Sequence, residues 1–320
     1  MSTRPLRWAV LGTANIAARA FLPAMRAAGH VAVAVGSRDP DRASAWAGEH
    51  QVGRAVGYAD AIAADDVDAI YVAVPNDQHV HWAALAAASG RAVVCEKPLG
   101  LDAGQVDDLL ARVGDALLWE AFVFPFHPQT ALLADLCAPD GPVGGVREII
   151  SEFHFRVTKA ENIRWSPTRG GGALLDVGCY PIRLARLLFG GEPEAASAGA
   201  VTAESGVDAE FAAVVSFPDA RRLIFSVGMR RAPSTYTRVI GDDGELRVSN
   251  PYHPTEHDTV ELWREGQCVQ TWAAHPARAF QHAIEHVGGV LDGRVQPLHL
   301  AATDAPGNAR ALDLVRAAAR

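Results

Sequence analysis

Short apolar runs alternate with helical patterns from Leu6 to about residue 120, and this alternation restricts the fold more than any other feature. Apolar runs without polar alternation are typical of strands that are buried on both faces. Strands that alternate with helices form βαβ units, whose strands are parallel. We therefore predict a doubly wound parallel sheet. The predicted strands are Leu6–Leu11, Val31–Val35, Ala69–Val74, Ala92–Cys95 and Ala116–Trp119, and the predicted helices are a stretch ending near Ala28, Pro40–His50, Gln78–Ser89 and Ala103–Val113.

The pattern changes after about residue 122. Residues Val146 to Val157 alternate between two faces, and later strands follow one another across short turns such as Pro218-Asp219. Consecutive strands on short turns predict a mainly antiparallel sheet, and with the helices near 277–291 and 309–319 an α+β domain. We predict a first domain over 1–121 and a second over 122–320, whose last helix, 309–319, packs back on the first. The strands expected after Val146–Val157 are Phe211–Phe217, Arg222–Gly228, Thr235–Ile240, Glu245–Val248, Thr259–Trp263 and Cys268–Ala273.

The turn after the first strand predicts a dinucleotide site. In a G-x-G-x-x-G turn the backbone approaches a pyrophosphate at a helix N-terminus, which defines the Rossmann type of sheet. Here the second and third glycines are replaced by Ala14 and Ala17, which still allow fairly close approach and tight packing. The cofactor-binding residues expected in this turn are Gly12, Thr13, Ala14, Asn15 and Ile16.

The end of the second strand favours NADP, with NAD as the alternative. An acidic residue there would bind the ribose 2′-hydroxyl of NAD, whereas this chain has Ser37 and Arg38. A hydroxyl and a guanidinium can hold a 2′-phosphate. The competing interpretation makes Arg38 a solvated loop residue, while Asp39 caps a helix that begins at Pro40.

Further polar residues follow the third and fourth strands. Lys97 comes directly after the apolar run Ala92–Cys95, at the carboxyl end of a buried strand, where open α/β sheets bind ligands. There its pKa can be moved by desolvation. An ordinary surface Glu-Lys turn remains the alternative. Glu120 can pair with Lys97 or accept backbone N–H groups, and His79 can be a packing residue. The cofactor contacts predicted at these loops are Pro75, Asn76, His79, Glu96 and Lys97.

A glycine-rich segment, Arg169 to Pro181, stands apart in the second half. If Ala173–Tyr180 is helical, Asp176 and Tyr180 lie at i and i+4 on one face. A carboxylate beside a phenol in an apolar stretch can move a proton. A structural Tyr-Asp hydrogen bond is the alternative, and Pro181 favours an extended Tyr180.

Composition and charge exclude several classes of protein. The net charge of −8 and the lack of a basic run argue against nucleic-acid binding. Four widely spaced cysteines predict neither a zinc site nor a disulfide framework, and we expect no metal. No apolar stretch is long enough to cross a membrane. A first strand beginning near Leu6 leaves no room for a signal peptide, so we expect a cytoplasmic protein without a membrane partner.

Together, Gly12–Ala17, the Pro75-Asn76 turn, Glu96–Pro98 and Gly170–Pro181 resemble the Gfo/Idh/MocA oxidoreductase family from residue 6 to about 250. The branch it resembles contains glucose–fructose oxidoreductase, NADP-dependent xylose and glucose dehydrogenases and dimeric dihydrodiol dehydrogenase. The resemblance implies a Rossmann domain and an open antiparallel sheet that often serves as a homodimer interface. It also implies that Lys97, Asp176 and Tyr180 face the nicotinamide and that Arg164 lies near the substrate. Many relatives have histidine in place of Tyr180, and Lys159–Glu161 and Trp165 look less typical.

With these residues, the resemblance implies hydride transfer between NADP and a sugar-like carbinol, most simply C1 of an aldopyranose. Tyr180 would exchange the hydroxyl proton, Lys97 would hydrogen-bond the reacting oxygen and lower the pKa of the phenol, and Asp176 would orient the tyrosine or the substrate. The predicted substrate-binding residues are Lys97, Arg164, Asp176 and Tyr180. The alternatives are a trans-dihydrodiol dehydrogenase, a dicarbonyl or anhydrosugar reductase, and a non-catalytic NADP-sensing protein.

Overall fold

A computed structural model describes residues 4–319, and they divide into two compact units. Unit 1 contains residues up to Val123 together with Ala279–Pro306, and unit 2 contains Phe124–Arg278 and the residues from Gly307. The chain therefore returns to unit 1 in a segment that the sequence placed in the second domain. Helix α8 (Ala279–Leu291) supplies the reason, because its Phe280 ring packs edge-on against the rings of Phe21 and Tyr71 in the unit 1 core. Helix α9 (Ala301–Ala318) begins in unit 1, and its residues from Gly307 belong to unit 2.

Unit 1 is built on a six-stranded parallel sheet, as predicted, with the strand order β3-β2-β1-β4-β5-β6. Strands β4 and β5 are buried along their whole length, since helices cover both faces of such a sheet. The strands are β1 (Arg7–Leu11), β2 (Val31–Gly36), β3 (Arg54–Val56), β4 (Ala69–Val72), β5 (Ala92–Cys95) and β6 (Leu118–Glu120), and the helices are a π-helical segment (Ala17–Phe21), α1 (Leu22–Ala27), α2 (Pro40–Glu49), α3 (Tyr58–Ala63), a 3₁₀ turn (Asn76–Gln78), α4 (His79–Ala88) and α5 (Ala103–Val113).

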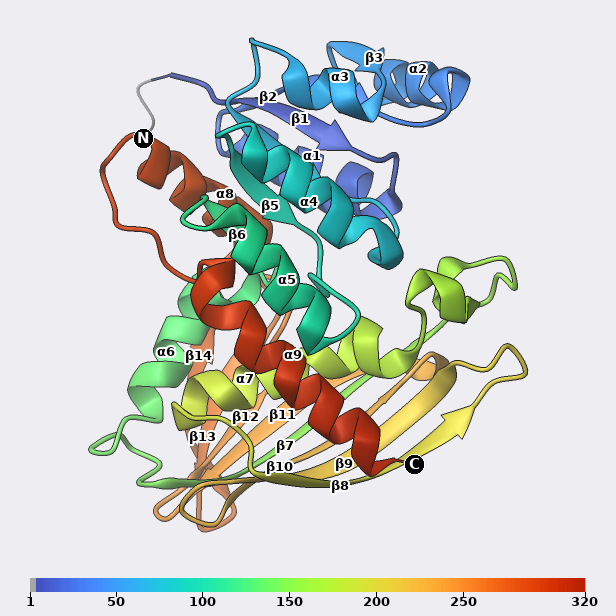
Figure 1. The fold of residues 1–320 in the computed structure, drawn as a ribbon. Coiled ribbons are helices and arrows are strands. Elements are labelled where there is room, and N and C mark those ends of the chain that lie inside the picture. Colours follow the sequence, from blue (N-terminus) through green and yellow to red (C-terminus); the bar gives the residue numbers. More distant parts are fainter. Residues whose placement is uncertain (1–3, 320) are drawn as a thin grey trace. The chain divides into compact units, whose positions relative to one another are not determined.

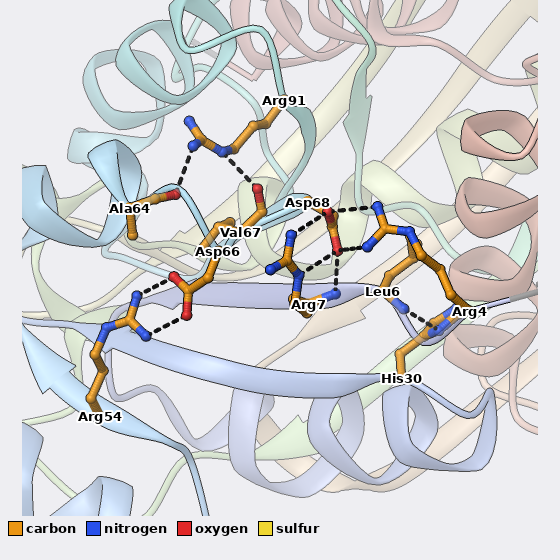
Figure 2. A network of polar contacts seen from close by, with 10 residues as sticks. All are labelled: Arg4, Leu6, Arg7, His30, Arg54, Ala64, Asp66, Val67, Asp68 and Arg91. Atoms are coloured by element: carbon orange, nitrogen blue, oxygen red, sulfur yellow. Dashed lines mark hydrogen bonds and ion pairs between the residues drawn. The ribbon is translucent and has the colours of Figure 1, made fainter.

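A network of arginines and aspartates fastens the amino-terminal edge of this sheet (Figure 2). The Asp68 carboxylate accepts hydrogen bonds from the Arg7 backbone N–H and from the guanidinium groups of Arg7 and Arg4. Burial raises the pKa of Asp68, but these hydrogen bonds outweigh it and hold the pKa well below its usual range. Arg91 donates to the carbonyls of Val67 and Ala64, in the loop that precedes β4 and contains Asp68. The network stabilises the edge opposite to the one where the strands' carboxyl ends lie.

Unit 2 is built on an eight-stranded sheet with the order β14-β13-β12-β11-β7-β10-β9-β8. It is mainly antiparallel, as predicted, but β7 and β10 form a parallel pair. The strands are β7 (Val146–Arg156), β8 (Ala195–Thr202), β9 (Asp208–Phe217), β10 (Arg221–Gly228), β11 (Arg230–Gly241), β12 (Glu245–Val248), β13 (Thr259–Arg264) and β14 (Gln267–Ala273), and the helices, besides short turns at Phe124–Phe126, Ile163–Trp165 and Pro167–Arg169, are α6 (Pro128–Leu136), a π-helical turn (Leu174–Gly178) and α7 (Cys179–Phe189).

One face of this second sheet packs against α7, which runs across the strands in Figure 1. Leu223, Phe225 and Val227 of β10 point toward the helix and are fully buried, whereas Ile224 and Ser226 alternate onto the opposite face. On that opposite face, Ile150, Val214 and Ile224 line a shallow hollow. Among the described residues, no helix is both long and apolar enough to cross a membrane.

Candidate active site

The turn after β1 has the close backbone packing that a dinucleotide turn requires. Gly12 has φ +105°, and a Cβ there would lie 2.3 Å from the carbonyl oxygen of Ala73. Its N–H donates to the Gly36 carbonyl at the end of β2 (2.9 Å). Ala17 is fully buried against the sheet, while Asn15 and Ile16 are exposed in the first helical turn. The turn therefore presents an open helix N-terminus at the carboxyl edge of the sheet, which is suited to a phosphate.

The end of β2 places both predicted NADP-binding residues at the same edge. Ser37 is buried and its Oγ accepts the Asp39 N–H (3.2 Å), while Arg38 is exposed. The Asp39 carboxylate accepts the Arg42 N–H, so the prediction that Asp39 caps α2 is confirmed. Burial raises the pKa of the Tyr58 phenol, and the charges of Arg38 and Arg42 partly offset this. A phenol and two guanidinium groups therefore gather at the end of β2.

Lys97 lies in the loop after β5, and the His79 ring hydrogen-bonds to this loop. The His79 ring is buried, with Nδ1 2.7 Å from the Pro98 carbonyl oxygen and Nε2 2.9 Å from that of Val74. Burial lowers the pKa of this ring, although the two carbonyls raise it in part. His79 thus joins the ends of β4 and β5 and positions the peptide that follows Lys97. Its predicted contact with a cofactor stays a prediction.

Two carboxylates support the same loop. Glu96 accepts a hydrogen bond from the hydroxyl of Tyr71, and its own N–H donates to the Val72 carbonyl. Glu120, at the end of β6, is buried and accepts the Leu99 N–H (2.8 Å). The second of the two roles left open for Glu120, acceptance of backbone N–H groups, is therefore present. Both acidic groups hold the backbone around Lys97.

The glycines of the 170–172 stretch have a structural reason. A Cβ on Gly171 would lie 2.4 Å from the Arg164 carbonyl oxygen, and one on Gly172 would lie 2.1 Å from Oδ1 of Asp208. Asp208 also accepts the Leu174 N–H (2.6 Å), and burial raises its pKa. The close approach is thus to this chain's own backbone and to a carboxylate that caps the following helical turn.

Asp176 and Arg164, both predicted substrate residues, form an ion pair. Arg164 Nε lies 2.6 Å from Oδ2 of Asp176, and the two side chains are 40 % and 13 % exposed. The Arg164 guanidinium also lies 5.5 Å from the ring centre of Phe155. Asp176 belongs to a π-helical turn, a local widening that is frequent at functional sites. The ion pair therefore holds Asp176 beside a partly exposed guanidinium.

Tyr180 lies in an aromatic box in unit 2. It is helical, contrary to the extended conformation that Pro181 favoured: the π-helical turn Leu174–Gly178 runs directly into α7, and the chain stays helical through Tyr180 and Pro181. The phenol is 6 % exposed. Its ring packs against those of Phe124, Phe153, Tyr252 and His253, with centres 5.2–6.3 Å apart. The box fixes the ring, and His253 Nε2 lies 3.4 Å from its hydroxyl oxygen.

Sequence reasoning missed Tyr71, Asp208 and His253. Tyr71 is a mid-strand residue without a local signal, whereas Asp208 begins β9 just after the Ser205-Gly206 turn, a signal that the prediction did not use. A signal existed for His253, since the Asn250-Pro251-Tyr252-His253 loop carries an imidazole beside an aromatic residue.

Comparison with known proteins agrees with this geometry. Residues 6–116 match the model of the oxidoreductase family with an NAD-binding Rossmann fold, and residues 137–247 match the GFO/IDH/MocA C-terminal domain. The chain is 33 % identical over 286 residues to "D-xylose 1-dehydrogenase (NADP(+)) 2" of Haloferax volcanii, covering 88 % of this chain and 87 % of that protein. It is 32 % identical to the trans-1,2-dihydrobenzene-1,2-diol dehydrogenase of Macaca fascicularis, covering 78 % and 77 %.

Among solved structures, a 3-ketoreductase from Actinomadura kijaniata in complex with NADP and TDP-benzene superposes with a TM-score of 0.88 at 31 % identity, covering 99 % of this chain and 98 % of that one. The fold and these matches define an NAD(P)-dependent oxidoreductase. The chain belongs to the Gfo/Idh/MocA family.

Proposed function

We propose that this oxidoreductase transfers a hydride between NADP and a sugar or sugar-like CH–OH group, in the manner of an aldose 1-dehydrogenase. The observation that carries the proposal is the buried phenol of Tyr180, held in an aromatic box in a chain that also has the dinucleotide turn at Gly12. The xylose dehydrogenase among the relatives supports a sugar as the substrate, and the NADP complex of the ketoreductase supports the cofactor.

The residues at the carboxyl edge of the first sheet fit NADP. The pyrophosphate would lie on the helix N-terminus at Thr13–Ile16, which follows the tight turn that Gly12 makes against the Ala73 carbonyl. Ser37 and Arg38 would hold the 2′-phosphate, and Pro75, Asn76 and Glu96 would lie along the nicotinamide half. When bound, the nicotinamide supplies or accepts the hydride. His79 would position the cofactor-binding loops indirectly, through its hydrogen bonds to the backbone carbonyls of Val74 and Pro98.

The remaining chemistry is proton transfer and orientation. In oxidation, Tyr180 takes the proton from the substrate hydroxyl as the hydride leaves the same carbon, and in reduction it returns the proton. Lys97 hydrogen-bonds the reacting oxygen, and its positive charge stabilises the phenolate form of the base. Arg164, oriented by Asp176, binds a second hydroxyl of the substrate.

Two other substrates and one other class of protein compete. The dihydrodiol dehydrogenase among the relatives supports a trans-diol as the substrate of this chain. The ketoreductase supports a carbonyl compound that is reduced. Assays with NADP⁺ and D-xylose, D-glucose or trans-dihydrobenzenediol, and with NADPH and a dicarbonyl or an anhydrosugar ketone, separate these activities. A non-catalytic NADP-sensing protein would bind NADP and turn over none of these substrates.

Arg38→Ala should shift the cofactor preference. We expect the KM for NADP⁺ to rise at least about tenfold, because a charge-assisted hydrogen bond contributes roughly 1.5–3 kcal/mol. The KM for NAD⁺ should change less than about twofold, since NAD has no 2′-phosphate for this guanidinium to bind. Arg112→Ala, an exposed arginine of α5, is the control. Equal losses with both cofactors would refute the assignment of Arg38 to the 2′-phosphate.

We also propose a homodimer formed by the open face of the second sheet, in a cytoplasmic protein whose free cysteines fit a reducing compartment. Val214 is 41 % exposed on that face. Two ion pairs, Arg222–Glu148 and Arg238–Glu245, place positive and negative groups beside the hollow. A second copy can therefore match both the apolar strip and the charges.

Light scattering should give twice the mass of one chain, and Val214→Asp should reduce it to the mass of a monomer. Val269→Asp, at an exposed residue of the edge strand β14, should leave the dimer intact. A wild-type monomer would contradict the proposal.

A further inference from the structure

We propose that His253 is the proton-exchange partner of Tyr180, which carries the substrate's proton between the buried phenol and water. The observation is geometric: Nε2 of His253 lies 3.4 Å from the Tyr180 hydroxyl oxygen, and the two rings meet edge to face with centres 5.3 Å apart. The phenol is nearly buried, whereas the histidine is exposed. An imidazole titrates near neutral pH, so it can pass a proton in either direction there.

Hydrogen bonds to both backbone groups of His253 hold the loop that carries it. The His253 N–H donates to Oδ1 of Asn250 (3.0 Å), and its carbonyl accepts from Nδ2 of Asn250 (2.7 Å). The Asn250 carbonyl in turn accepts from Nε2 of the buried Gln129 (2.9 Å). Further along the loop, Asp258 accepts from Thr255 and Ser249. The imidazole is therefore held beside Tyr180 by its backbone as well as by ring packing.

The neighbouring Tyr252 has a different role. Its hydroxyl lies 2.6 Å from Ser151 Oγ, which lies 2.7 Å from Thr237 Oγ1, and all three groups are buried. Burial raises the pKa of Tyr252 well above its usual value, so this phenol does not release a proton near neutral pH. Tyr252 is a wall of the box, and the exposed imidazole provides the route to water.

The transfer balances without a further reactant, and it rests on the proposed role of Tyr180. In oxidation the substrate's O–H bond breaks and its proton binds the phenolate oxygen of Tyr180. The phenol then gives its proton to Nε2 of His253, which becomes an imidazolium, and the imidazolium releases a proton to water. The phenolate is restored for the next turnover, and in reduction the same steps run in reverse.

The first test measures turnover of the full-length protein with NADP⁺ and D-xylose. His253→Phe keeps an aromatic ring in the box but removes the proton acceptor, and we expect kcat to fall at least about tenfold. His253→Ala leaves room for a free ring, and added imidazole should restore a large part of its loss, which a purely structural role would not allow. His257→Phe is the matched control, because His257 lies on the same loop and is exposed. An undiminished kcat in His253→Phe, or a loss in His253→Ala that imidazole does not rescue, would refute the relay.

A second test needs no turnover, so it checks the contact between Tyr180 and His253 even if D-xylose is not a substrate. In nuclear magnetic resonance spectra, Tyr180→Phe should move the ring resonances of His253 and leave those of His257 in place. Unmoved His253 resonances would refute the contact. The proposed function fails in a different way, namely if Tyr180→Phe keeps full turnover. If Tyr180→Phe is inactive while His253→Phe is fully active, the relay is refuted and the proposed function stands.

Discussion

Tyr180→Phe should lower kcat by about 10²–10⁴-fold, the range in which positioned acid–base groups contribute. The variant loses only a hydroxyl, and its ring still fits among Phe153, Tyr252 and the other members of the box. The proton of the substrate hydroxyl then has no base to accept it as the hydride leaves. Because the proposed cofactor turn lies in unit 1, the dissociation constant for NADP should stay within about twofold, a change worth less than about 0.5 kcal/mol.

The control is the neighbouring Tyr252→Phe. It removes a hydroxyl from the same box, but one that is bonded to Ser151. We expect kcat to stay near the wild-type value and the free energy of unfolding to fall by about 1 kcal/mol. Rapid-mixing measurements of NADPH formation with the true substrate separate the chemical step from product release. Near-normal turnover in Tyr180→Phe would remove this phenol from the mechanism.

Lys97→Met should lower kcat by about 10²–10³-fold, because the ammonium stabilises charge on the reacting oxygen. Methionine keeps the length of the side chain and loses its charge and donors. The loop itself should persist, since His79 and Glu120 hold its backbone on either side. In oxidation the remaining activity should increase toward higher pH, where the phenolate forms without the help of a nearby positive charge.

The chain offers a simple control, because its only lysines are Lys97 and Lys159. Lys159 is exposed beyond the end of β7, and Lys159→Met should leave kcat and its pH profile unchanged. Steady-state kinetics over a range of pH, with NADP binding measured by fluorescence, checks both variants. If Lys97→Met lost affinity for NADP while kcat stayed normal, the lysine would be a cofactor ligand only.

Much of the fold could be predicted because periodicity encodes burial. Ala92–Cys95, Ala103–Val113 and Glu245–Val248 have the predicted bounds. The prediction missed β3, α3 and β8, and the reasons differ. The first two are only three and six residues long, and β8 consists largely of alanine, glycine and serine, which carry little strand signal. It also missed α6, although Pro128 at its first position is a helix signal.

The pairing of β7 with β10 shows where local patterns stop. Val146–Val157 was correctly predicted as a two-faced strand, and Ile149 and Ser151 indeed lie on the buried face. The strands that pair with it start 75 and more residues later, and one pairs in parallel. Strand order and direction depend on how the whole sheet closes against α7, which no single strand encodes.

By itself, the sequence determined the alternation of strands and helices in the first half, the glycine turn at Gly12 after the first strand and the residue types on which the proposed chemistry depends, Lys97, Asp176 and Tyr180. These depend on local spacing, which a chain carries before it folds. Only the tertiary structure decided the partners: Arg164 for Asp176, the Pro98 carbonyl for His79, and His253 for Tyr180. Each of these contacts joins residues 12 to 73 positions apart, and packing rather than local pattern decides which side chains meet.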